Sequence, residues 1–185
     1  MKQKILAALG VAFNLALAAG ATSATQPAAP PAASPRAQAR LEPLAAPSVA
    51  GTVDLIQQDD GVVVTARLTG LTPGLHAFHV HQHGSCDHGG QAAGAHFDAS
   101  ADSGRGERVE HHGGAFGALT ADQDGVARLS VRLPASTLVL AGPRGVVGRS
   151  IVVHTSPDDY AGTPGQVAAK GRILACGVIR AAGNA

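Results

Sequence analysis

Aromatic and charged residues are scarce in this chain of 185 residues. It contains no tryptophan, one tyrosine and four phenylalanines, and only 15% of its residues are charged. So few aromatic side chains exclude a stacking platform for nucleic-acid bases. Lys and Arg number 14 against 13 Asp and Glu, so the chain also lacks the strong positive charge of a nucleic-acid binder. We therefore expect no nucleic-acid partner.

Glycine and histidine, by contrast, are prominent. The 24 glycines, together with a charged content below the ~25% of typical globular domains, favour a turn-rich β protein over a helical bundle. All nine histidines lie between His76 and His154. We therefore expect the functional site to lie in the region from residue 76 to residue 154.

The N-terminus has the pattern of a secretory signal peptide. Two lysines precede an apolar stretch from Ile5 to Gly20, and the small residues that follow permit cleavage after Ala21 or Ala24. The apolar stretch is shorter than the ~20 residues that span a bilayer, and no later stretch qualifies. We expect residues 1–24 to be removed on export to the periplasm, with no stable membrane anchor.

Residues 25–48 are rich in alanine and contain six prolines. Such a composition does not continue a helix or a sheet and predicts an extended linker. The folded domain is then expected to span residues 49–182.

From residue 49 onward, apolar residues alternate with polar ones, as in half-buried strands. Two alternating runs, 53–55 and 62–68, flank a turn at 59–61 and predict a hairpin. A third run at 129–133 follows a turn at 122–125, and apolar runs at 146–153 and 173–179 predict two more strands. The pattern predicts an all-β sandwich or barrel. The long irregular segments 82–114 and 155–171 are then expected to be functional loops.

Several histidines lie where these strands meet the loops. His79 and His81 are two residues apart on a predicted strand, so their side chains share a face, whereas His76 faces the other side. His154 ends one apolar run, and His96 begins a short segment within a loop. Imidazole is a ligand for copper, zinc, iron or nickel, and four imidazoles suit a tetragonal copper site. The spacing predicts a metal site and leaves redox or hydrolytic chemistry open.

Cys86 and Cys176 are the two cysteines of the chain. In an exported protein an even pair predicts a single disulfide. A thiolate metal pair is the alternative, and the absence of a C-x-x-C motif disfavours it.

Residues 74–81, with the sequence GLHAFHVH, resemble the first signature of the copper–zinc superoxide dismutases, and residues 171–179, which end in ACGVI, resemble the last. Residues 120–127 and 148–154 match the family pattern between them, in the same order. The short gap from His81 to Cys86 is similar to that of bacterial exported members. The resemblance covers residues 49–180. It implies an eight-stranded Greek-key β-barrel, a Cys86–Cys176 disulfide and the dismutation of superoxide.

The resemblance also implies roles for single residues. In the family, copper alternates between two oxidation states as it oxidises one superoxide and reduces the next. His96 would bridge copper and zinc through its two ring nitrogens. His76 corresponds to a histidine that braces a loop, and Asp158 to a carboxylate that connects the two metal sites and orients imidazole ligands. The implied copper ligands are His79, His81, His96 and His154.

The zinc half departs from the family pattern, which adds two histidines and an aspartate to His96. Only His112 aligns; the aspartate position is Ala115, and residues 103–105 contain no histidine. Zinc normally takes four protein ligands in such a site. Two outcomes stay open: copper without a specific zinc site, or a zinc site rebuilt from neighbouring side chains. Those neighbours are His111, Glu110, Glu107, Asp102, Asp98, His83 and His88.

The active-site arginine of the family is displaced as well. Family members place it three residues before the final cysteine, a position held here by Ile173, while Arg172 lies one residue earlier. A shift of one residue on a strand turns the side chain to the other face. Arg172 is therefore expected to act in catalysis only if a bulge restores its direction.

These features predict a copper-dependent superoxide dismutase in the periplasm, acting on superoxide as a monomer or a homodimer. The alternative is a non-enzymatic protein of the dismutase fold. Such a protein would store or buffer copper, or bind haem through the histidine-rich loop at 82–88.

Overall fold

The computed structural model describes residues 34–98, 116–156 and 171–183. Apart from one short 3-10 helix (η1, Gln91–Ala93), all regular elements in these ranges are β-strands. No helix in the described part of the chain is long and apolar enough to span a bilayer. The predicted signal peptide lies outside the described residues.

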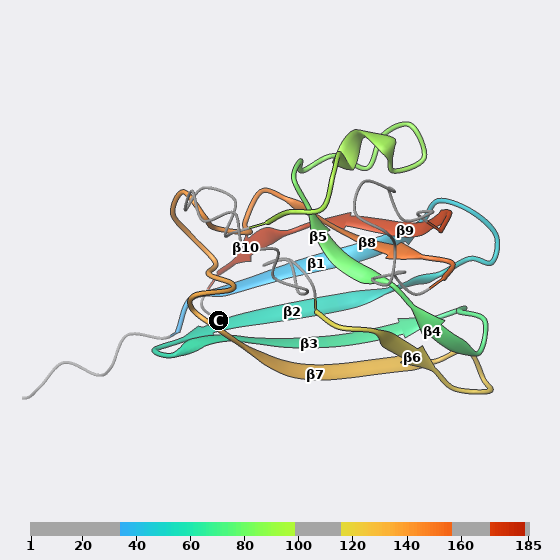
Figure 1. The fold of residues 1–185 in the computed structure, drawn as a ribbon, viewed down its shortest axis with the longest axis horizontal. Coiled ribbons are helices and arrows are strands. Elements are labelled where there is room, and N and C mark those ends of the chain that lie inside the picture. Colours follow the sequence, from blue (N-terminus) through green and yellow to red (C-terminus); the bar gives the residue numbers. More distant parts are fainter. Residues whose placement is uncertain (1–33, 99–115, 157–170, 184–185) are drawn as a thin grey trace, which may run out of the picture. The chain divides into compact units, whose positions relative to one another are not determined.

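The strands form one antiparallel sheet in the order β4-β6-β7-β3-β2-β1-β9-β8-β5, and β10 pairs with β1 (Figure 1). Their bounds are β1 Arg36–Pro43, β2 Ala50–Gln58, β3 Gly61–Thr69, β4 Gly74–His76, β5 Phe78–His81, β6 Leu119–Ala121, β7 Ala127–Pro134, β8 Ser150–His154, β9 Ile173–Val178 and β10 Arg180–Ala182.

The two ends of this sheet belong to one stretch of chain, because only Ala77 separates β4 from β5. Ile179 alone likewise separates β9 from β10. The ten strands therefore correspond to eight continuous stretches around a nearly closed barrel. The connections from β3 to β4 and from β7 to β8 join strands that are not neighbours, as in a Greek key. The predicted all-β, eight-stranded barrel is confirmed.

The predicted hairpin is formed by β2 and β3. Gln58 pairs with Gly61, which leaves Asp59 and Asp60 as the turn between the two strands. The apolar residues that alternate along both strands are buried in one core, as their period of two requires. The third alternating run lies in β7, where Leu129, Val131 and Leu133 are half-buried against the same core.

The predicted strand over 146–153 begins later than expected. β8 starts at Ser150, and the residues before it form turns. Val146 is nonetheless fully buried in the core. Its apolar character therefore reflects packing of a turn, which periodicity alone does not distinguish from a strand.

The prediction that residues 25–48 form a linker is wrong for residues 36–43. These residues form β1, which pairs with β2 along six residue pairs and also contacts β9 and β10. Ala37, Ala39 and Leu41 point into the core, while the residues between them are exposed. The prolines at 35 and 43 stand at the ends of this strand, where the loss of a backbone donor costs little. The fold therefore begins before residue 49.

Candidate metal centre

Strand β5 presents two different faces, both of them buried. Phe78 and Val80 point into the barrel core. Because side chains alternate along a strand, His79 and His81 point to the opposite face. Each of these two histidines exposes only 2% of its surface. The two imidazoles thus lie side by side on the outer side of the barrel wall.

Strand β8 places the third imidazole beside them. It pairs antiparallel with β5, with Val152 opposite His79 and Val153 opposite Phe78. Ile151 and Val153 belong to the barrel core, so Val152 and His154 share the outer face. The last residue of β8, His154, therefore lies diagonally across from His79 and is 3% exposed.

The fourth imidazole comes from the loop that follows β5. This loop returns along the strand, and His81 and His96 form an isolated antiparallel bridge. The Phe97 amide donates to the Val80 carbonyl at 2.8 Å, and the Gln82 amide donates to the Ala95 carbonyl at 2.9 Å. β5 thus lies between β8 on one edge and the His96 segment on the other.

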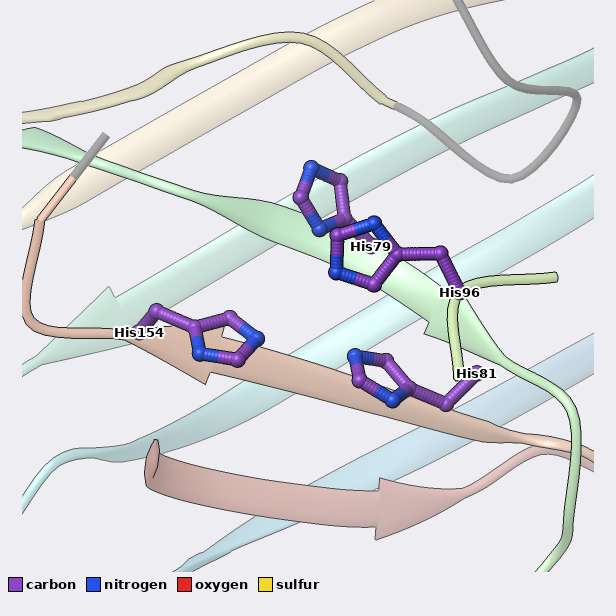
Figure 2. Close-up of side chains that lie close together, drawn as sticks. All are labelled: His79, His81, His96 and His154. Atoms are coloured by element: carbon purple, nitrogen blue, oxygen red, sulfur yellow. The ribbon is translucent and has the colours of Figure 1, made fainter. Parts of the chain in front are cut away.

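These four side chains converge on one point (Figure 2). Each offers one ring nitrogen, and the four nitrogens all lie within 4.8 Å of one another. The ring centroids of His79 and His96 are 4.2 Å apart, and those of His81 and His154 are 5.6 Å apart. The structure therefore brings together the four histidines to which sequence analysis assigned copper.

Backbone carbonyls orient two of the rings. His81 Nδ1 donates to the Gly94 carbonyl at 2.9 Å, and His154 Nδ1 donates to the Gly171 carbonyl at 2.8 Å. A carbonyl oxygen only accepts, so each Nδ1 carries the proton. The lone pair is then on Nε2, the atom that each of these rings buries at the point of convergence.

The donor set fits copper. Four imidazole nitrogens from three separate segments surround one buried point, and two rings are held in the tautomer that places the nitrogen lone pair on Nε2. Imidazole ligands suit copper, and a site of four nitrogens accommodates the tetragonal geometry of Cu(II).

His76 lies outside this cluster, on the other side of the strand. Its Nδ1 lies 2.9 Å from the carbonyl oxygen of His154, and its Nε2 lies 2.8 Å from that of Thr72. The ring is 1% exposed. It therefore connects the segment before β4 to the backbone of a cluster residue, a bracing position.

A pocket of about 360 Å³ opens beside the cluster and is lined by both His81 and His154. Arg172 also lines it, and its Nη2 donates to the Ala46 carbonyl at 2.7 Å. The register of β8 and β9 shifts here, since Val153 pairs with Ala175 but His154 pairs with Ile173. A cation therefore borders the same pocket as two of the clustered imidazoles.

The position that the family reserves for arginine is filled differently. Ile173 packs with Leu44 and the two cysteines in a small apolar cluster. Gly90 lies so close that an added Cβ would approach Ile173 to 2.9 Å. With this irregular pairing, the Ile173 side chain packs in the apolar cluster, and Arg172 lines the pocket.

The predicted disulfide is confirmed. Cys86 and Cys176 are bonded, with their Cα atoms 5.7 Å apart. The bond connects the loop after β5 to β9 on the side of the apolar cluster described above. It therefore links the loop that carries His96 to the sheet.

Several other predicted residues are not placed. His111, His112, Glu110, Glu107, Asp102 and Asp158 lie outside the described residues. Asp98 is half-buried, and His83 and His88 are exposed on the loop after β5. The metal-binding cluster found among the described residues does not include these three.

Sequence analysis also missed residues that shape the site. Gly94 and Gly171 supply the carbonyls that orient two rings, and Arg149 contacts the segments next to His81 and His96. The roles of the two glycines depend on backbone oxygens, for which the sequence carries no signal. Arg149 precedes an apolar run in the sequence and belongs to no motif that indicates its contacts, which only the folded structure reveals.

Comparison with known proteins finds a matching family model and many similar curated proteins. Residues 49–179 match the family model described as copper/zinc superoxide dismutase. The chain is also similar to "Superoxide dismutase [Cu-Zn] 2" of Mesembryanthemum crystallinum, with 38% identity over 138 residues, 71% of this chain and 87% of that protein.

Proposed function

The chain belongs to the copper/zinc superoxide dismutase family and is a superoxide dismutase, and we propose that it works with copper held by His79, His81, His96 and His154. The observation that carries this proposal is the convergence of four buried imidazole nitrogens within 4.8 Å. Family membership supports the enzyme over the non-catalytic alternative.

Copper bound there would supply one-electron redox chemistry, which oxidises one superoxide to dioxygen and reduces the next to hydrogen peroxide. The protein would hold the copper ion and orient the imidazole rings that bind it. The Gly94 and Gly171 carbonyls hold the protons of His81 and His154 on Nδ1, so that Nε2 faces the centre. Such outer hydrogen bonds fix the tautomer and the ring orientation of metal ligands.

We assign the attraction of the substrate to Arg172. Superoxide is an anion, and this guanidinium lines the pocket that reaches His81 and His154. The hydrogen bond to the Ala46 carbonyl holds the side chain there. Electrostatic steering of this kind raises association rates by ~10–10³-fold.

We further propose that the protein is exported to the periplasm, with the signal peptide cleaved after Ala21 or Ala24. The support is the pattern of the N-terminus and the presence of a disulfide, a bond that persists in oxidising compartments. Mass spectrometry of the protein recovered from a periplasmic fraction tests this. A mature chain starting at Thr22 or Thr25 is expected, and an intact Met1 in the cytoplasm would contradict it.

The copper proposal is tested by preparing the protein metal-free and adding Cu(II) while superoxide dismutation is measured. Activity is expected to rise with bound copper and to be absent in His79→Ala and His154→Ala. His88→Ala is the matched control, because His88 is exposed on the loop and outside the cluster. Full activity of the copper-free protein would overturn the proposal.

A further inference from the structure

We infer that Arg149 is a positioning residue for the metal centre, because its one guanidinium group holds the two backbone segments that carry His81 and His96. This inference rests on the proposed copper site. Arg149 lies directly before β8, and its guanidinium contacts the Gly145 and Gln82 carbonyls and the Phe97 ring.

The guanidinium of Arg149 makes three contacts with three segments. Its Nη1 donates to the Gln82 carbonyl at 2.8 Å, and its Nε donates to the Gly145 carbonyl at 2.9 Å. Its central carbon lies 3.8 Å from the centroid of the Phe97 ring, the geometry of a cation–π contact. Gln82 follows His81 directly, and Phe97 follows His96 directly. One planar group thus fixes the neighbour of each of two proposed ligands.

The backbone of Arg149 is itself held firmly. Its amide donates to the Val146 carbonyl at 3.0 Å, and its carbonyl accepts from the Ile179 amide at 2.8 Å. Val146 and Ile179 are both fully buried in the barrel core. Through Arg149, the segments that carry His81 and His96 are therefore connected to buried residues of the barrel core.

The next residue extends the same arrangement. Ser150 is fully buried, and its hydroxyl donates to the His83 carbonyl at 2.7 Å. The side chains of Arg149, directly before β8, and of Ser150, its first residue, thus hold the carbonyls of Gln82 and His83, the two residues after His81. The beginning of β8, the strand that ends in His154, therefore holds the chain where it leaves β5, the strand that carries His79 and His81.

This support matters most for His96. Its segment is joined to the end of β5 by one isolated bridge, which consists of two backbone hydrogen bonds, and to the residues after β5 by a further hydrogen bond from the His83 amide to the Ala93 carbonyl. In the described residues these bonds do not extend into a longer ladder. Phe97 is 6% exposed, with the Arg149 guanidinium over its ring. Since adjacent side chains in an extended segment point to opposite sides, holding Phe97 on one side fixes the direction of His96 on the other.

Lysine cannot replace this arginine. An ammonium group is a point charge, whereas the guanidinium donates in two directions from a rigid plane that also stacks on an aromatic ring. Arg149→Lys therefore keeps the charge and removes the geometry. Phe97→Leu keeps a buried apolar side chain and removes the ring face. Arg132→Lys is the matched control, because Arg132 pairs with Asp60 on the outer face of β7.

The test measures Cu(II) affinity of the full chain by chelator competition, together with the electron paramagnetic resonance spectrum of the loaded protein. Arg149→Lys is expected to raise the copper dissociation constant about tenfold, as loss of an outer-shell partner does, and to broaden the spectrum or split it into more than one species. Phe97→Leu is expected to act in the same direction, and the double variant to be no weaker than Arg149→Lys alone, since both remove one contact. Arg132→Lys is expected to match wild type.

The outcomes separate this inference from the proposed function. Wild-type affinity and an unchanged spectrum in folded Arg149→Lys and Phe97→Leu would overturn the positioning role alone, even if both variants unfold at lower temperature. A wild-type chain that binds no copper would overturn the proposed function together with it. If Arg149→Lys failed to fold, Phe97→Leu would still decide the question.

Discussion

The Gly94 carbonyl accepts the Nδ1 proton of His81 at 2.9 Å, and Gly94 reaches this position with φ 79° and ψ −151°. That combination is essentially restricted to glycine. An added Cβ would also lie 2.6 Å from Cδ2 of His83. A backbone conformation closed to other residues thus sets the orientation of a proposed copper ligand.

Gly94→Ala is therefore expected to cost about 1–3 kcal/mol of stability, the usual cost of a strained backbone conformation, and to weaken copper binding as well. Gly125→Ala is the matched control. Gly125 also has a positive φ of 72°, and its added Cβ would lie 2.5 Å from the Leu71 carbonyl oxygen, but it orients no clustered ring. Denaturant unfolding and copper titration of both variants check the prediction. Equal loss of copper affinity in both would contradict it.

Removal of the cation at the pocket tests the role of Arg172. Arg172→Ala is expected to lower the second-order rate constant for superoxide about tenfold or more and to flatten its dependence on ionic strength, because electrostatic steering is lost. Copper content should stay unchanged. Arg180→Ala is the control, since Arg180 is exposed and lines a different pocket. An unchanged salt dependence in Arg172→Ala would contradict the assignment.

The site was predictable from sequence where its signal is local. His79 and His81 share a face because they are two residues apart on a strand. His76 is separated from each of them by an odd number of positions, so its ring lies on the other side. His154 and His96 were recognisable as candidate metal ligands from their places at strand ends and from the family motifs. The structure adds how they meet, through the antiparallel register of β8 and the bridge from His81 to His96.

The start of the fold was not predictable in the same way. The prolines at 35 and 43 masked the alternation of Ala37, Ala39 and Leu41, which is a strand pattern made of small residues. Composition indicated a linker, but alanines pack well in a barrel wall where neighbouring strands carry the larger side chains. The contacts of Arg149 likewise join segments about 50 and 70 residues apart, which no window of sequence reveals.

The strand β1 leads to a prediction about the minimal domain. A chain starting at Val49 is expected to be unfolded or severely destabilised, because it lacks three core residues and exposes the edges of β2 and β9. Loss of buried Leu41 alone would cost about 2–5 kcal/mol, as in Leu→Ala changes. A chain starting at Ser34 should unfold with the same midpoint as the mature protein. Circular dichroism and thermal unfolding compare the two, and cooperative unfolding of the shorter chain at the same midpoint would refute the prediction.

Reduction of the disulfide is expected to affect both stability and metal retention. The double variant Cys86→Ser with Cys176→Ser should lose about 2–5 kcal/mol, because the bond closes a long loop in the unfolded chain. It should also release copper to a chelator faster, since the loop tied by Cys86 carries Gly94 and His96. No free thiol should titrate in the unfolded, unreduced wild-type protein. Wild-type copper retention in the double variant would show that the loop is positioned without the bond.

The zinc content follows from the donor residues that the sequence provides. His96 and His112 are two of the ligands in the family pattern, but Ala115 replaces the aspartate and residues 103–105 contain no histidine. Because zinc sites normally use four ligands, the purified protein is expected to hold copper at about one ion per chain and zinc far below that. Elemental analysis after dialysis against a mild chelator measures both metals in the wild-type protein and in His112→Ala. Ala115→Asp returns a carboxylate to the pattern and is expected to raise zinc retention, with copper content unchanged. Stoichiometric zinc in the wild-type protein that resists the chelator and is lost in His112→Ala would show instead that neighbouring side chains, such as His111 and Glu110, have rebuilt the site.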